Sequence, residues 1–443
     1  MTRTNSDRTL LFSALPALLI AALLALGCNG SPELDSASWD QFHGPGGTGV
    51  SPETDLPLYW GEDGAGIRWK SAVPPGVSSP IVSRSQVILT AETVTGKKTN
   101  LKVISLSLKN GKPLWETDVF SRSREEIELR SVNNSPAGPT PATDGEHIFA
   151  YFGSHLAALD FDGQVVWLRR IDPKYLDEIR YGAGSSVVLT DSSVIVLRDQ
   201  EETGRAGWLA AFDKKTGERR WRRRWQDTCC SYTTPVLLRR ETHTEVIIAV
   251  ARRIQAFDAD SGKRIWHRPQ DMNQPVASPV LVDDLLCSAT GAHGVKDAAC
   301  WQLDFAKKPK KMAKRLWRAR KGINSIATPV LYNDMLFSIT DKGVLYSFDP
   351  RTGATHWVAR LSPGPYVASL VAGDGKIYAF SRHGGGSVIA ASAEYQLLAE
   401  NQLPEGEILA SPAIAGGCLL LRSDAHLLCV EGTAEPVAAK PAA

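Results

Sequence analysis

Residues Ser325–Leu361 decide the fold: SIATPVLYNDMLFSITDKGVLYSFDPRTGATHWVARL. The stretch predicts four short strands, over Ala327–Leu331, Met335–Thr340, Val344–Phe348 and around Trp357. Asn-Asp, Asp-Lys-Gly and Asp-Pro-Arg-Thr-Gly separate them, and these are residues that tight turns favour because Pro presets one backbone dihedral and Gly supplies a positive φ. A unit of this kind exposes an apolar face on each side, so we expect it to stack against copies of itself.

The tail of this unit recurs along the chain as small-x-Asp-x-x-Thr-Gly-x-x-x-Trp. Its instances, from full to partial agreement, are Ala211–Trp221, Ala256–Trp266, Ser347–Trp357, Ser105–Trp115, the shorter Ala158–Trp167, and Gln302–Trp317, which carries an insertion. The head of the unit, a Ser or Thr before a strand, occurs eight times, at Ser79, Thr140, Ser185-Ser186, Thr234, Ser278, Thr328, Ser369 and Ser411. Eight heads predict eight structural units.

The ends of the chain complement each other. The seventh tail has Leu398 where Trp belongs, and the eighth unit, Ala410–Val430, stops before its tail. The missing tail stands upstream, in Gly66–Trp69. An N-terminal strand that completes the last sheet closes a β-propeller and hides its edges. We therefore predict an all-β, eight-bladed propeller over residues 39–432, closed by that strand; an irregular set of β-sandwiches is the alternative that the regular Gly-to-Trp spacing disfavours.

Seven tryptophans of the tails are expected to pack between neighbouring blades. They are Trp69, Trp115, Trp167, Trp221, Trp266, Trp317 and Trp357. The repeat that carries them is similar to the tryptophan-docking repeat of the pyrroloquinoline-quinone (PQQ) family of eight-bladed propellers. The opening Trp39–Val50, WDQFHGPGGTGV, resembles the start of PQQ-like repeat lipoproteins of planctomycete-type bacteria. The resemblance implies the fold over nearly all of the mature chain and is less specific for chemistry, because the family includes enzymes and non-enzymes.

The N-terminus has the pattern of a secretion signal over residues 1–27, with Arg3 and Arg8 before an apolar core. Leu24–Cys28 resembles a bacterial lipobox, although Leu26 is larger than the residue usual there, and implies lipidation of Cys28; a plain signal peptide is the alternative. Residues 28–38 are a polar tether, and residues 433–443 have the composition of a disordered tail. We expect a cell-envelope location on the periplasmic face of the outer membrane, or in the periplasm without lipidation.

Composition is that of an ordinary globular protein, with 43% hydrophobic residues, 22% charged residues and a net charge of +2. This balance gives no indication of a nucleic-acid partner. The repeat indicates one closed ring, which we expect to be monomeric.

Six cysteines besides Cys28 form three local candidate pairs, in keeping with an exported protein. The pairs are Cys229 with Cys230, Cys287 with Cys300, and Cys418 with Cys429. A symmetric hairpin places the second pair opposite each other, whereas the third is expected to be diagonal. Free buried thiols are the alternative for all of them.

The adjacent pair Cys229-Cys230 raises the question of a cofactor. The resemblance implies one chemical reading, since PQQ-dependent alcohol dehydrogenases cover the quinone with a disulfide between neighbouring cysteines. Such an enzyme also needs Ca²⁺ held by oxygen ligands and an Asp base near the quinone. We assign neither in this sequence, and the long insertions that build the pocket of those enzymes are missing. We therefore expect no PQQ, no Ca²⁺ and no catalytic residue.

Two basic clusters stand out. One is Arg219–Arg224, RRWRRR; the other lies in and after the insertion of the fifth unit and comprises Lys307, Lys308, Lys310, Lys311, Lys314, Arg315, Arg318, Arg320 and Lys321. Charged outer strands discourage edge-to-edge pairing, which is one interpretation. The other is a docking patch for an acidic protein, an anionic lipid or a cell-wall polymer.

These observations favour a non-catalytic binding scaffold of the cell envelope with a protein partner. The closest resemblance in architecture is to the BamB-type lipoproteins of outer-membrane barrel assembly, which share a lipobox, an eight-bladed ring and a similar length. A PQQ-dependent dehydrogenase and a small-molecule or glycan sensor that uses the channel mouth are the alternatives.

Overall fold

The decisive stretch folds into four antiparallel strands: β22 (Val330–Tyr332), β23 (Met335–Ile339), β24 (Val344–Phe348) and β25 (Thr355–Arg360). Gly353, in the turn before β25, has φ of 75°, and a Cβ atom there would lie 2.7 Å from the ring of Trp317 in the preceding sheet. The glycine of the repeat is therefore required twice, for a left-handed backbone and for the close approach of a tryptophan.

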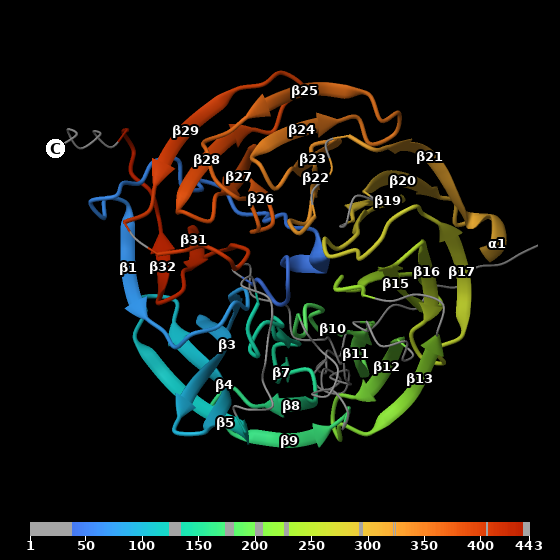
Figure 1. The fold of residues 1–443 in the computed structure, drawn as a ribbon, viewed down its shortest axis with the longest axis horizontal. Helices are drawn as coiled ribbons and strands as arrows, with labels where there is room; N and C mark the ends of the chain where they lie inside the picture. The colour runs from blue at the N-terminus through green and yellow to red at the C-terminus, as the bar shows by residue number, and fades with distance from the viewer. Residues whose placement is uncertain are drawn as a thin grey trace, which may run out of the picture. The chain divides into compact units, whose positions relative to one another are not determined.

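The computed structural model describes residues 38–123, 134–172, 181–199, 207–225, 230–291, 296–321, 323, 325–404 and 406–436. These residues form eight four-stranded sheets, called blades 1 to 8 here, arranged in a ring (Figure 1). Blade 1 consists of β2 (Ile81–Ser83), β3 (Gln86–Thr95), β4 (Lys98–Ser107) and β5 (Pro113–Ser123), and blade 2 of β6 (Ala142–Thr143), β7 (Ile148–Tyr151), β8 (His155–Leu159) and β9 (Val165–Arg170). Blade 3 consists of β10 (Val188–Leu189), β11 (Ser193–Arg198), β12 (Gly207–Asp213) and β13 (Arg219–Trp225), and blade 4 of β14 (Val236–Arg239), β15 (Thr244–Val250), β16 (Arg253–Asp258) and β17 (Arg264–Pro269). Blade 5 is β18 (Val280–Val282), β19 (Leu285–Thr290), β20 (Asp297–Leu303), β21 (Ala313–Ala319); blade 6 is β22–β25; blade 7 is β26 (Val371–Gly373), β27 (Lys376–Phe380), β28 (Gly385–Ala390), β29 (Leu397–Gln402); and blade 8 is β30 (Ala413–Ala415), β31 (Cys418–Arg422), β32 (His426–Val430) with β1 (Ile67–Ala72).

The ring closes as predicted. Strand β1 pairs antiparallel with β32, so that blade 8 has the order β1-β32-β31-β30. In Figure 1 the blue strand β1 lies beside the red strand β32 at the outer edge of that blade. The eight-bladed propeller and its N-terminal closing strand are thus confirmed, and the outer edge of blade 8 is a strand from the other end of the chain.

The apolar core is distributed between neighbouring blades. Phe149 and Tyr151 of blade 2, for example, share one buried cluster with Val194 and Trp208 of blade 3. Both faces of each middle strand are buried because each sheet packs on two others. Stability therefore depends on every contact between blades, as expected from a repeat that cannot fold alone.

Helical structure within the described residues is limited to the short 3₁₀ turn η1 (Pro45–Gly47) and to α1 (Pro309–Met312), which lies in the insertion of blade 5. Neither element comes near the length and apolarity that crossing a bilayer requires. The basic insertion is therefore the one place in the described ring where a helix interrupts the strand–turn repeat.

Candidate functional site

The head residues form a continuous ring of hydrogen bonds around the channel, which we call the hydroxyl ring. The backbone N–H of each member donates to the side-chain oxygen of its counterpart in the next blade. The bonds run from Ser79 to Thr140 (3.0 Å), Ser186 (3.0 Å), Thr234 (3.0 Å), Ser278 (2.9 Å), Thr328 (3.2 Å), Ser369 (3.1 Å), Ser411 (3.0 Å) and back to Ser79 (3.1 Å). Each head is a hydroxyl residue because a buried N–H of the preceding blade needs an acceptor there.

One end of the channel is closed by the N-terminal segment, residues 39–60. Trp39 pairs with Val82 of blade 1, η1 contacts β14 of blade 4, and Val50 pairs with Ala372 of blade 7. A segment that touches sheets on opposite sides of a ring has to cross its axis, and in Figure 1 this blue segment runs through the centre of the ring. Phe42, from this segment, lines the channel cavity and forms its floor.

The floor is anchored by a buried histidine. His43 is 1% exposed, and its Nε2 lies 2.8 Å from the Leu370 carbonyl oxygen. Burial lowers the pKa of His43, which favours the neutral imidazole. The Gly-rich run that follows lets the backbone approach the His43 ring closely, since a Cβ on Gly49 would lie 2.4 Å from that ring. The opening motif is thus explained as a plug of the channel.

A second ring of side chains lies two residues before the hydroxyl ring, toward the mouth. We call it the collar; its members from blade 1 to blade 8 are Val77, Gly138, Gly184, Tyr232, Val276, Ile326, Val367 and Leu409. Because the innermost strands run from mouth to floor, every blade places this position above its hydroxyl. Five members are aliphatic, so most of the mouth is apolar.

The collar is interrupted at blades 2 to 4. A Cβ on Gly138 would lie 2.0 Å from Oδ1 of Asn134, and one on Gly184 would lie 2.9 Å from Cβ of Tyr232. These glycines admit Asn134 and Tyr232 to the mouth. Tyr181, 36% exposed, stands edge-on to Tyr232 with ring centroids 6.4 Å apart. The mouth therefore has one aliphatic wall and one aromatic and amide wall.

The cavity above the floor has a volume of about 380 Å³. Its described lining contains hydroxyl, amide, aromatic and aliphatic side chains and no charged one. PQQ carries three carboxylates, and a Ca²⁺ partner needs acidic oxygen ligands. Among the described residues no group of three or more His, Cys, Asp or Glu is placed to hold a metal ion. The described lining thus does not fit PQQ and Ca²⁺.

The tail tryptophans fasten neighbouring blades at the rim. In six cases the indole Nε1–H donates to a backbone carbonyl in the turn of the next blade: Trp69 to Leu108 (2.9 Å), Trp115 to Phe161 (2.8 Å), Trp167 to Lys214 (2.8 Å), Trp221 to Ala259 (2.8 Å), Trp317 to Pro350 (2.7 Å) and Trp357 to Ser392 (3.0 Å). These contacts give the tryptophans a structural role.

Side chains two residues after the tryptophans add a second bond of the same kind, which the sequence analysis missed. Ser71, Thr117, Arg169, Arg223 and Arg268 donate to backbone carbonyls of the next blade at 2.6–2.7 Å. Arg223 belongs to the basic cluster 219–224. That cluster therefore contributes at least one inter-blade contact, a structural role that neither interpretation named. The Trp-x-polar spacing would have been the signal.

Trp266 is the exception, because the insertion replaces the turn that would receive it. Its Nε1 donates instead to Glu245 in its own blade, at 2.9 Å. The Glu245 side chain has no exposed surface. It also forms an ion pair with Arg240, whose Nη1 lies 3.2 Å from Oε1 of Glu245. Arg240 in turn lies 5.1 Å from the ring centroid of Phe305 and donates to its carbonyl oxygen at 3.1 Å. The start of the insertion is thereby fixed to blade 4.

The candidate partner patch divides into paired and unpaired cations. Lys307 pairs with Asp304, Arg318 with Asp271 and Asp297, and Arg320 with Asp271. Lys308, Lys311, Lys314, Arg315 and Lys321 are exposed and have no ion pair within the described residues; the side chain of Lys310, in α1, is not described. We call Lys308, Lys311, Lys314 and Arg315 the basic face of the insertion.

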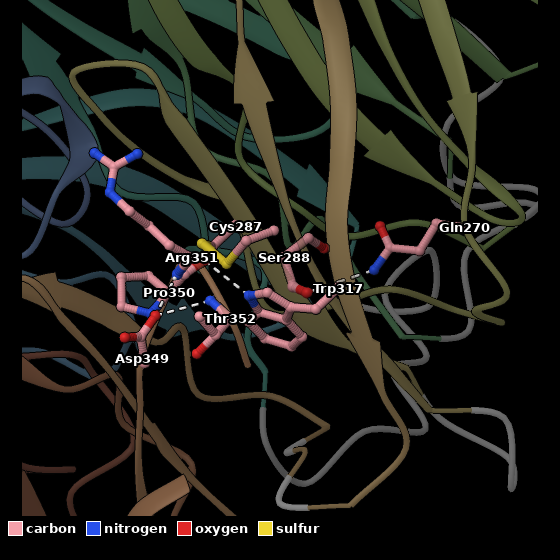
Figure 2. Close-up of a disulfide and its surroundings, with 9 residues drawn as sticks. Gln270, Cys287, Ser288, Trp317, Asp349, Pro350, Arg351 and Thr352 are labelled. Carbon is pink, nitrogen blue, oxygen red and sulfur yellow. Dashed lines mark hydrogen bonds between the residues drawn. A yellow bond between two sulfur atoms is a disulfide. The ribbon is translucent and has the colours of Figure 1, made fainter. Parts of the chain in front are cut away.

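Two of the three cysteine pairs lie within the described residues, and their outcomes differ. Cys287 and Cys300 lie opposite each other on β19 and β20 and form a disulfide with Cα atoms 4.1 Å apart. Figure 2 shows this disulfide beside Trp317, whose indole reaches Pro350. Cys418 and Cys429 are buried free thiols, so the candidate third disulfide is not formed. The register agrees with the expected diagonal placement, because Cys429 pairs with Leu420 and not with Cys418.

Two further candidates fall partly or wholly outside the described residues. Cys28 and Cys229 both lie there, so lipidation and the Cys229–Cys230 disulfide stay predictions. Cys230 is described; it is buried and has φ of 68°.

Residues 134–359, half of the chain, match the family described as outer membrane protein assembly factor BamB. The structure is similar to BamB from Moraxella catarrhalis, with a TM-score of 0.57 at 14% identity, over 83% of this chain and 99% of that one. It is also similar to a quinohemoprotein alcohol dehydrogenase from Comamonas testosteroni (TM-score 0.60, 12% identity, 91% and 82% coverage) and to a europium-containing methanol dehydrogenase (0.64, 12%, 87% and 89%). None of the curated proteins matches the sequence. Structural likeness at such identities shows the fold alone.

Proposed function

Because the chain belongs to the BamB family of PQQ-repeat propellers, we propose that it is a non-catalytic scaffold of the cell envelope that holds a protein partner in outer-membrane barrel assembly. Its ring is a rigid support, since the hydroxyl ring and the tryptophan contacts tie each blade to the next. A binding surface on such a support loses little conformational entropy when the partner docks.

The observation that carries this proposal is the fixed insertion of blade 5. The insertion is held by Arg240, which pairs with the fully buried Glu245 and donates to the Phe305 carbonyl oxygen. Arg268 adds a bond of 2.6 Å from Nε to the Ala313 carbonyl oxygen, where the insertion ends. Both ends of the insertion are therefore fixed, and we propose that the exposed cations of the basic face receive an acidic surface of the partner.

Placement in the envelope is part of the same proposal. We propose export through residues 1–27 and anchoring by a lipid on Cys28, which would hold the ring on the periplasmic side of the outer membrane. The ring would then meet its partner at the membrane surface, where an anchored scaffold gains effective concentration.

The test is affinity capture of the tagged, full-length protein from detergent-solubilised outer membranes. A variant with Lys308, Lys311, Lys314 and Arg315 changed to Glu reverses the basic face; a control changes Lys109, Lys112, Lys215 and Lys263, exposed lysines of other blades, to Glu. We expect the parent and the control to retain a β-barrel assembly protein that the reversed variant loses. Equal capture by all three, or capture of no barrel-assembly protein, would contradict the proposal.

A further inference from the structure

The channel is a blind pocket. Residues 39–60 cross the axis and close one end with Phe42, whereas the collar surrounds the other end. The enclosed volume of about 380 Å³ lies within the range of roughly 300–1,000 Å³ that holds small ligands. The pairing of β1 with β32 closes the ring of blades, and the N-terminal segment adds the floor.

The hydroxyl ring offers hydrogen-bond donors to this pocket. Each of its eight oxygens accepts an N–H from the preceding blade, and none of the eight hydroxyls donates to an acceptor within the described residues. All eight residues are at most 6% exposed. A buried hydroxyl hydrogen needs an acceptor, so we expect a molecule that fills the pocket to carry oxygen atoms that accept these hydrogens.

The walls restrict that content further. No cation lines the described part of the pocket, so an anionic ligand would lose its hydration without compensation. The aliphatic side of the collar suits an apolar face, and Tyr181 and Tyr232 offer aromatic surface on the other side. Water can accept hydrogen bonds from the hydroxyls, but it makes no favourable contact with the aromatic and aliphatic side chains at the mouth.

We propose that the channel mouth binds a small neutral polyhydroxylated ligand of the pyranose class. Its ring oxygens and hydroxyls would accept from the hydroxyl ring, and the C–H face of the sugar would lie against Tyr181 or the collar. This site is independent of the basic face of the insertion on the outer rim, so either proposal can fail without the other.

The experiment titrates glucose, galactose and N-acetylglucosamine into the full-length protein, with glucuronate as the charged comparison, and follows binding by saturation-transfer NMR and calorimetry. Val276→Phe fills the mouth without touching the hydroxyl ring, and Val358→Phe, on exposed β25, is its matched control. Tyr181→Ala removes the aromatic surface, with the exposed Tyr395→Ala as control. Melting temperatures establish that each variant is folded.

We expect saturable binding of at least one neutral sugar and none of glucuronate. Val276→Phe should abolish binding and Tyr181→Ala should weaken it by about tenfold, whereas both controls should match the parent. The proposal is overturned if none of the three sugars binds at millimolar concentration, if Val276→Phe leaves affinity unchanged, or if glucuronate binds as tightly as the neutral sugars.

Discussion

Trp69 of strand β1 lies directly opposite Cys429 of strand β32, and its indole Nε1 donates to the Leu108 carbonyl oxygen of blade 1 at 2.9 Å. One residue near the N-terminus thus pairs with the last strand and fastens blade 8 to blade 1. The junction where the two ends of the chain meet is therefore fastened by the same tryptophan-to-carbonyl contact as the junctions between consecutive blades.

Truncating this residue tests closure. Trp69→Ala should lower the free energy of unfolding by about 3–5 kcal/mol, as expected for loss of a buried tryptophan. Gly111→Ala should also destabilise, because its φ is 68° and the new Cβ would lie 2.5 Å from the Trp69 ring. In the double variant the part of the Gly111→Ala cost that comes from the Trp69 ring should disappear, whereas the clash with Ser71 Oγ, 2.4 Å from the new Cβ, remains. A double-mutant cycle by urea unfolding would measure the difference.

The control for this cycle is Leu397→Ala, at a 39% exposed position of β29. If Trp69→Ala melts as cooperatively and at the same temperature as the parent, the closing contact contributes nothing to stability.

The sequence predicts the ring because the repeat is local: Gly353 and Trp317 each stand at a fixed place in a unit. The hydroxyl ring was visible only as a series of heads, since the bond between Thr328 and Ser369 joins different blades. The floor was not predictable from spacing, because Phe42 reaches the channel only after its segment crosses the axis. Glu245 gave no signal either, as its role arises where an insertion removes the turn that Trp266 would meet.

Thr328→Val tests the hydroxyl ring. Valine keeps the shape of threonine and removes the acceptor of the Ser278 backbone N–H, which would be left buried. The expected loss is about 1–3 kcal/mol of unfolding free energy, the cost of an unsatisfied buried donor. Thr355→Val, at an exposed position of β25, is the control and should change stability little. Equal stability of both variants would show that water replaces the bond without loss.

Asp40 should make stability depend on pH. Burial raises the pKa of its carboxyl to about 6, despite the nearby Arg239, from 3.8 for the free group. As pH rises from about 4 to about 6 the unfolded state releases the proton first, so the folded state loses up to about 3 kcal/mol and stays lower above that range. Asp40→Asn removes this titration. Its melting temperature should exceed that of the parent increasingly from pH 4 to pH 6, whereas exposed Asp162→Asn should follow the parent; a constant difference would refute the assignment.

Cys28 should determine where the protein resides. Cys28→Ala removes the sulfur that a lipid would occupy, so the variant should accumulate unprocessed or in the soluble periplasmic fraction. Asn29→Ala keeps the cysteine and should fractionate with the parent. Fractionation and metabolic labelling with a fatty acid provide the measurement, and unchanged partition of Cys28→Ala into membranes with normal processing would exclude a lipid anchor.

Addition of PQQ and Ca²⁺ should produce neither binding nor turnover. The described channel lining has no charged side chain to pair with the three carboxylates of PQQ, so the quinone would be desolvated without compensation. Quinone absorbance and reduction of an artificial electron acceptor, followed across primary alcohols and aldoses, provide the two readouts. Stoichiometric binding with substrate-dependent reduction, lost in Cys229→Ser/Cys230→Ser, would instead make the adjacent cysteines part of an active site. Binding without turnover would leave the channel as a quinone receptor, and its charged ligand would then contradict the neutral-sugar pocket as well.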